Sequence, residues 1–131
     1  MLKEYKTIIL EEENSAAILK LNRPNKLNAF NMQMLDDMLD AIDQVNKDDN
    51  IKSLIITGSG RAFCAGADLS LGEKTFDKNF DTKAKYESDF RRDAGGILSL
   101  KIYNSLKPVI AACNGDAVGI GATMQLPADI R

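Results

Sequence analysis

The sequence predicts an α/β domain whose sheet is mostly parallel and begins with an antiparallel hairpin. Two strand patterns, at residues 7–12 and 16–21, are separated by a short polar turn, which is typical of a hairpin. Two further apolar strands, at residues 51–57 and 109–113, are separated by helical patterns from the hairpin and from each other. Strands that alternate with helices favour parallel pairing, so we expect a single layered domain.

The hairpin and the first loop follow from their residue types. Residues 7–12 run from β-branched and apolar side chains to a charged end, and Glu13, Asn14 and Ser15 form the expected turn. Residues 23–26 are expected to form a loop, because Pro24 lacks an N–H group and biases the residue before it away from a helix.

An amphipathic helix is the clearest element of the sequence, and Asn31 is expected to cap it. Its apolar face is expected to comprise Met34, Leu35, Met38, Leu39, Ile42 and Val45. The aspartates of the same stretch, which are Asp36, Asp37, Asp40 and Asp43, are expected to lie away from that face.

The second half of the chain is less regular. Residues 71–82 have no clean period and are interpreted as a mobile loop that can order over a ligand. A long helix is expected at residues 86–106, weakened by Gly95 and Gly96, and a short one at residues 121–126. Residues 128–131 resemble the start of a new strand. We therefore expect residues 1–131 to be the N-terminal part of a longer domain whose C-terminal remainder is absent.

Composition excludes several classes of function. A net charge of −2 gives no electrostatic case for binding nucleic acid or an anionic membrane. No apolar run approaches a membrane span and no signal peptide is recognisable, so a cytoplasmic location is expected. Histidine is absent, which excludes Ser-His-Asp and Cys-His chemistry. Cys64 and Cys113 form no CxxC pair, so no metal site is expected, and both are interpreted as small buried residues.

Two stretches of small residues follow the two later strands. Residues 61–69 come after the third strand, and residues 114–122 come after the fourth. Glycine lets the chain turn sharply and lets another backbone or a ligand approach closely. Ligands of open parallel sheets bind outside the carboxyl ends of the strands. We therefore expect these two glycine turns to aim two backbone N–H groups at one oxyanion.

Four motifs resemble the crotonase family, that is, the enoyl-CoA hydratase/isomerase family. They are Leu21-Asn22-Arg23-Pro24 with Lys26-Leu27-Asn28-Ala29, the run at residues 62–69, Lys107-Pro108-Val109-Ile110-Ala111, and Asn114-Gly115 with Gly119-Ile120-Gly121. The resemblance covers essentially the whole chain and implies a crotonase-like fold of ββα-type units. Family members are usually much longer, which agrees with an N-terminal part.

The resemblance implies a coenzyme A thioester as substrate and no separate cofactor. Its carbonyl oxygen would be held by the backbone N–H groups of Ala67 and Ile120. The implied coenzyme A contacts comprise Lys26, Leu27, Ala29, Ala65, Gly66, Asp68, Leu69 and Gly119, with Lys26 and Arg23 as candidates for the phosphates. The resemblance also implies a homotrimer or a pair of trimers.

The chain departs from the family at a position that matters for catalysis. Where hydratases usually carry a glutamate, this chain has Thr123, which cannot act as a carboxylate base. A one-proton shift, as in an enoyl-CoA isomerase, therefore fits at least as well as hydration. Asp116 and Glu73 are weaker acid–base candidates, because turn-forming and exposed carboxylates are commoner than catalytic ones. Asp68 is expected to cap the helix after its loop rather than to act in catalysis.

Two other functions stay open. A non-catalytic acyl-CoA binder, or an inactive fragment, would keep the pocket without a base. A nucleotide-binding module is less favoured, because neither the GxxxxGKS/T pattern nor the GxGxxG pattern occurs.

Overall fold

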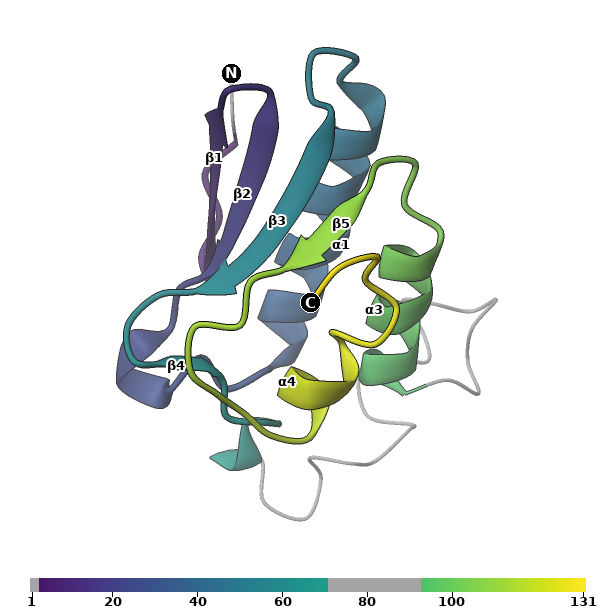
Figure 1. Cartoon of the computed structure of the whole chain (residues 1–131). Helices are drawn as coiled ribbons and strands as arrows, with labels where there is room; N and C mark the ends of the chain where they lie inside the picture. The colour runs from purple at the N-terminus through teal and green to yellow at the C-terminus, as the bar shows by residue number, and fades with distance from the viewer. Residues whose placement is uncertain (1–2, 71–92) are drawn as a thin grey trace.

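A computed structural model describes residues 3–70 and 93–131 (Figure 1). Its main sheet has the strand order β1-β2-β3-β5, with β1 at Ile8–Glu13, β2 at Ala16–Leu21, β3 at Ser53–Gly58 and β5 at Val109–Ala111. β1 and β2 pair antiparallel, whereas β2 with β3 and β3 with β5 pair parallel. The expected class, a mostly parallel sheet with a leading hairpin, is confirmed.

The loop that connects β1 and β2 consists of two residues. Glu13 pairs directly with Ala16, and the two residues between them, Asn14 and Ser15, have φ angles of 50° and 68°. Two-residue loops with positive φ at both positions match the twist of the flanking strands. Asparagine tolerates this left-handed conformation better than most residues, which explains its place in the turn.

Helix α1 (Met32–Lys47) lies behind the main sheet, and α3 (Ala94–Tyr103) lies beside it (Figure 1). As expected, Asn31 caps α1, because its Oδ1 accepts a hydrogen bond from the N–H of Met34 at 2.9 Å. The expected apolar face is buried except for Leu39, which is partly buried. Burial of this face joins α1 to the strands and forms the centre of the core.

Asp37 departs from the expected pattern, because it is buried, with only 7% of its surface exposed. One carboxylate oxygen accepts hydrogen bonds from the N–H and the hydroxyl of Thr7, at 2.9 and 2.7 Å. The other oxygen accepts from Nε2 of Gln33 at 2.8 Å. The expectation that all four aspartates avoid the buried side of α1 is therefore wrong for Asp37. It anchors the segment that leads into β1.

A second, two-stranded parallel sheet was not expected. It consists of β4 (Ala62–Cys64) and β6 (Asp116–Ala117), which lie within the two glycine turns. A short 3-10 helix, η1 (Pro24–Lys26), precedes α1, and α4 (Ile120–Thr123) follows β6 and is shorter than expected. The two turns are thus held to each other by strand pairing, in addition to their links to the main sheet.

The end of the described chain makes a single strand contact. Ile130 forms a parallel bridge with Ile110 of β5, and the N–H of Ala111 donates to the carbonyl of Ile130 at 2.8 Å. The expected loop at residues 71–82, Glu73, and the first part of the expected helix at residues 86–92 lie outside the described residues. Within residues 3–70 and 93–131, the structure contains no helix that is both long and apolar enough to cross a membrane.

Candidate functional site

Pairing of β4 with β6 brings the two glycine turns side by side. Ala62 pairs with Asp116 and Cys64 pairs with Ala117. One step further, the N–H of Val118 donates to the carbonyl of Cys64 at 3.0 Å. Residues 65–69 and 118–121 therefore leave the small sheet together, as the sequence predicted for the two turns.

Glycines allow the two backbones to come this close. A Cβ at Gly115 would lie 2.0 Å from the carbonyl oxygen of Arg61, and a Cβ at Gly121 would lie 2.0 Å from that of Cys64. Gly66 has a φ of 112°, and a Cβ there would meet the carbonyl of Val118 at 3.3 Å. No side chain fits at Gly115 or Gly121 unless the backbone moves.

Ala67 forms an isolated parallel bridge with Phe30, which fixes the direction of its N–H group. The N–H of Phe30 donates to the carbonyl of Gly66, and the N–H of Asp68 donates to the carbonyl of Phe30, both at 2.8 Å. Backbone groups of successive residues in an extended chain point to opposite edges. The N–H of Ala67 therefore points away from Phe30.

Ile120 is the first residue of α4, and Gly119 precedes it with φ 57° and ψ −123°. The next three N–H groups bond within the turn, since Gly121 donates to Val118, and both Ala122 and Thr123 donate to Gly119. Within the described residues, neither the N–H of Ile120 nor that of Ala67 donates a hydrogen bond. Among the described residues, each glycine turn thus carries one backbone N–H that has no acceptor.

The loop before α1 packs against the first glycine turn. The carbonyl of Leu27 accepts a hydrogen bond from the N–H of Ala65 at 3.0 Å, and the N–H of Ala29 donates to the carbonyl of Lys26 at 3.0 Å. Lys26 is exposed, whereas Leu27 and Ala29 are half-buried. The structure therefore brings together the two stretches in which the resemblance placed coenzyme A contacts.

Arg23 and Asp68 join the same two stretches by an ion pair of 3.0 Å, with side chains only 19% and 16% exposed. Arg23 also donates to the carbonyl of Ala29, so its guanidinium is engaged within the protein. Asp68 Oδ1 accepts from the N–H of Ser70 at 2.9 Å, as expected for a capping residue. This hydrogen bond, and then the Arg23 guanidinium, hold the pKa of Asp68 below its usual range.

Of the acid–base candidates that the structure describes, one lies in the second turn and one directly follows it. Asp116 is exposed on β6, and Thr123 is exposed on α4, where its hydroxyl donates to the carbonyl of Ile120 at 3.5 Å. Cys64 is buried, and burial raises the pKa of its thiol. The expectation that Cys113 is also buried is wrong, because this residue lies beyond the end of β5 and is exposed.

Sequence reasoning assigned no role to Asn28 and Asn114, although both lie in the quoted motifs. Asn28 is fully buried, with a φ of 56°, and both side chains bond to the backbone between β3 and β4. An asparagine in a loop, or directly after an apolar strand, is too common a signal to reveal such a contact.

Comparison with known proteins decides the family. The family model for enoyl-CoA hydratase/isomerase matches residues 11–131.

The chain belongs to the enoyl-CoA hydratase/isomerase family.

It is similar to enoyl-CoA hydratase AKT3-2 of Alternaria alternata, at 42% identity over 92% of this chain and 38% of that protein. It is also similar to 1,2-epoxyphenylacetyl-CoA isomerase of Escherichia coli, at 39% identity over 94% of this chain and 45% of that protein. The structure of enoyl-CoA hydratase from Thermoplasma volcanium matches with a TM-score of 0.76 and 33% identity, covering 95% of this chain and 47% of that one. The chain thus spans less than half the length of these relatives.

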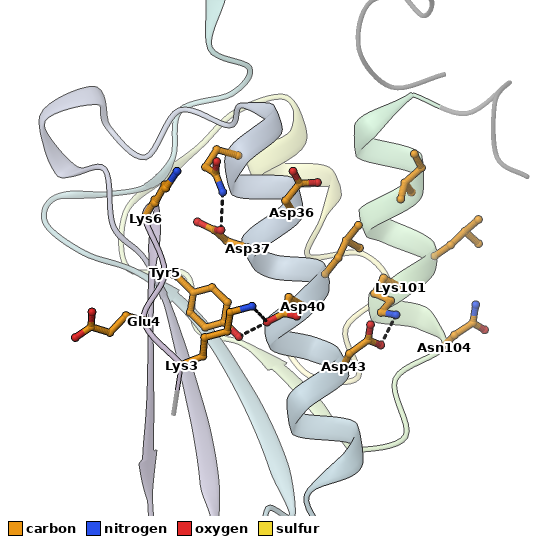
Figure 2. A pocket seen from close by; sticks show the side chains of 14 residues that line it. Lys3, Glu4, Tyr5, Lys6, Asp36, Asp37, Asp40, Asp43, Lys101 and Asn104 are labelled. Atoms are coloured by element: carbon orange, nitrogen blue, oxygen red, sulfur yellow. Dashed lines mark hydrogen bonds and ion pairs between the residues drawn. The ribbon is translucent and has the colours of Figure 1, made fainter. Parts of the chain in front are cut away.

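An open groove of about 930 Å³ lies away from the glycine turns of this family member, between the N-terminal segment, α1 and α3 (Figure 2). The carboxylates of Asp40 and Asp43 in this groove are engaged by neighbours. Asp40 accepts from the hydroxyl of Tyr5 at 2.7 Å and pairs with Lys3 at 3.2 Å, while Asp43 pairs with Lys101. The groove contains none of the expected site residues, so the glycine turns are the candidate site.

Proposed function

We propose that the protein acts on coenzyme A thioesters and stabilises an enolate-like state through the backbone N–H groups of Ala67 and Ile120. The observation that carries this proposal is the pairing of the two glycine turns, each with one N–H that finds no acceptor within residues 3–70 and 93–131. As a proton leaves the carbon next to a thioester, negative charge develops on the carbonyl oxygen. Two fixed donors directed at that oxygen stabilise the charge without reorganisation.

Coenzyme A would lie along the loop before α1 and the first glycine turn. We propose contacts with the backbone of Ala65, Gly66, Asp68 and Leu69, with Leu27 and Ala29 opposite and Gly119 beside the thioester. Support comes from the direct hydrogen bond between Leu27 and Ala65 and from the half-buried state of Ala29. Lys26 is the better candidate for the phosphates, since it is exposed, whereas Arg23 is engaged by Asp68.

We favour isomerisation of an enoyl thioester over hydration. Hydration needs one group to activate water and another to deliver a proton, and Thr123 provides no carboxylate for either role. Moving a double bond needs one group that carries one proton, and Asp116 is the carboxylate of the second turn that could be tested first. We further propose a homotrimer or a pair of trimers and no cofactor beyond the substrate, as the resemblance implies, and a cytoplasmic location.

Proline substitution tests the proposal at the backbone itself. Ile120 occupies the first position of α4, where proline is tolerated because its missing N–H makes no helical bond. Ile120→Pro should lower formation of the acetoacetyl-CoA enolate, seen by its near-ultraviolet absorbance, by about 10²–10³-fold. Ile120→Ala is the matched control, because it removes the side chain but keeps the N–H.

The outcomes separate the candidate functions. If the wild-type protein forms the enolate and Ile120→Pro does so equally well, Ile120 is not a donor. If the wild-type protein binds coenzyme A thioesters but neither enolises acetoacetyl-CoA nor converts 3-enoyl or 2-enoyl thioesters, it is a non-catalytic acyl-CoA binder. If it binds none of them, the acyl-CoA assignment is wrong.

A further inference from the structure

One carbonyl oxygen at the start of β4 receives two side-chain amides. The carbonyl of Ala62 accepts from Nδ2 of Asn28 at 2.9 Å and from Nδ2 of Asn114 at 3.2 Å. Asn28 comes from the loop before α1, and Asn114 stands at the start of the second glycine turn. Three segments that are distant in sequence therefore meet at a single acceptor.

Both amides also bond to the bend between β3 and β4, at residues 58–62. Nδ2 of Asn28 donates to the carbonyl of Ser59 at 3.0 Å, and Nδ2 of Asn114 donates to that of Gly60 at 3.0 Å. Oδ1 of Asn114 accepts from the N–H of Gly58 at 2.9 Å. The two side chains thus bond to three carbonyl groups and one N–H group of this bend.

The position of this bend affects where the N–H groups of Ala67 and Ile120 lie. Ala62 opens β4, which leads within five residues to Ala67, and Asn114 leads through β6 to Ile120. A Cβ at Gly58 would lie 2.9 Å from Nδ2 of Asn28, so the amide already fills the available space. A shift of the bend would move the first turn relative to the second.

We propose that Asn28 and Asn114 are positioning residues, which set the separation of the Ala67 and Ile120 N–H groups through the shared Ala62 carbonyl. This inference rests on the proposed function, because it assumes that these two groups hold the thioester oxygen. Neither asparagine contacts the reacting atoms. Each acts through the bend that carries β4, and displacement of a catalytic group by about 1 Å can cost on the order of 100-fold in rate.

Asn114 is the residue to change, because it is exposed, whereas Asn28 is fully buried and its loss would first affect folding. Asn114→Asp keeps the shape and the acceptor for Gly58 but removes the donor for Gly60 and Ala62. Asn114→Ala removes both functions without adding a charge. Thr57→Val is the matched control, since Thr57 Oγ1 makes a nearby bond of 2.8 Å to the carbonyl of Ala112 and does not contact the bend.

The test compares two readouts in the whole protein. Binding of free coenzyme A, which has no thioester carbonyl, reports on the general integrity of the site. Enolate absorbance of bound acetoacetyl-CoA reports on the two N–H groups. We expect both Asn114 variants to bind coenzyme A normally and to lose about 10-fold or more in the bound enolate fraction, while Thr57→Val matches the wild type.

The inference is overturned if the enolate fraction of the Asn114 variants is unchanged, if it falls only in parallel with coenzyme A affinity, or if Thr57→Val shows the same loss. Absence of any enolate in the wild-type protein is a different result. It would overturn the proposed function itself, and the positioning role with it.

Discussion

Gly95 faces the side chain of Ile120, since a Cβ on Gly95 would lie 2.9 Å from Cδ1 of the isoleucine. The first turn of α3 therefore begins directly against the residue whose N–H is a proposed donor. Gly95 was expected only to weaken a helix. Its contact explains why a residue of low helix propensity occupies this position.

This contact predicts coupling between the two residues. Gly95→Ala gains up to about 1 kcal/mol from helix propensity, but the new methyl group must displace Cδ1 of Ile120, which reduces the gain. Ile120→Val removes Cδ1, so Gly95→Ala should stabilise the protein more in the Ile120→Val background. Denaturant unfolding of the four variants measures this coupling. Equal effects of Gly95→Ala in both backgrounds would contradict it.

Two neighbouring glycines should respond differently to alanine. Gly121→Ala places a Cβ 2.0 Å from the carbonyl oxygen of Cys64 and should cost more than about 3 kcal/mol, or prevent folding. A Cβ at Gly119 would make only an ordinary contact, 3.8 Å from Cα of Gly66, so the cost there is that of placing alanine at φ 57° and ψ −123°, about 1–3 kcal/mol. Urea unfolding curves would show which of the two alanine substitutions lowers the free energy of unfolding more. A smaller effect at Gly121 than at Gly119 would mean that the turns do not pack as described.

The sequence was informative where structure is local and less so where partners are distant. The hairpin, the Asn31 cap and the apolar face of α1 depend on residues close together, and all three were predicted. β4 and β6 contain three and two residues, too few to show a strand period, so they were interpreted as turns. The partner of Asp37 is thirty positions away, and no periodicity reveals a contact of that kind.

At the candidate site, too, the sequence revealed local features but not contacts between distant residues. Residue types around Gly66 and Gly121 indicated two close-approach turns, because glycine has few other reasons to recur there. The engagement of Arg23 by Asp68, the exposure of Cys113 and the two asparagine amides on Ala62 depend on tertiary neighbours. Sequence reasoning could not supply these.

The bonds of Asp68 to the N–H of Ser70 and to Arg23 predict a pH-dependent stability. The pKa of Asp68 is lowered on folding, so its contribution is complete above the unfolded value of about 4 and is lost as pH falls through the lower folded pKa. Asp68→Asn should cost about 1–2 kcal/mol at neutral pH, and the difference from wild type should shrink below about pH 4. Unfolding free energies measured across this range test it.

An exposed pair supplies the control for that measurement. Glu11 and Lys20 lie 3.0 Å apart, with side chains 50% and 35% exposed. Glu11→Gln should change stability by less than about 0.5 kcal/mol at any pH. If Asp68→Asn behaved like Glu11→Gln, the ion pair with Arg23 would not hold the loop against the first turn.

Asp37 and Asp40 of α1 both bond to the N-terminal segment, and they should contribute differently to stability. Asp37→Ala leaves the buried N–H and hydroxyl of Thr7 without an acceptor and should cost about 2–3 kcal/mol. Asp40 is 37% exposed at its side chain, so Asp40→Ala should cost less than about 1 kcal/mol despite its bonds to Tyr5 and Lys3. Denaturant midpoints of the two variants would settle the order, and equal losses would contradict the burial of Asp37.

The pairing of β4 with β6 has a consequence for the order in which the protein forms. Asn114 and Gly60 are fifty-four positions apart, whereas the hairpin closes over two residues. Contacts of such long separation form late, because the intervening chain must first be closed into a loop. During synthesis, β4 in the first turn therefore cannot pair until β6 in the second turn has left the ribosome. The region that would meet the substrate is therefore assembled later than the hairpin.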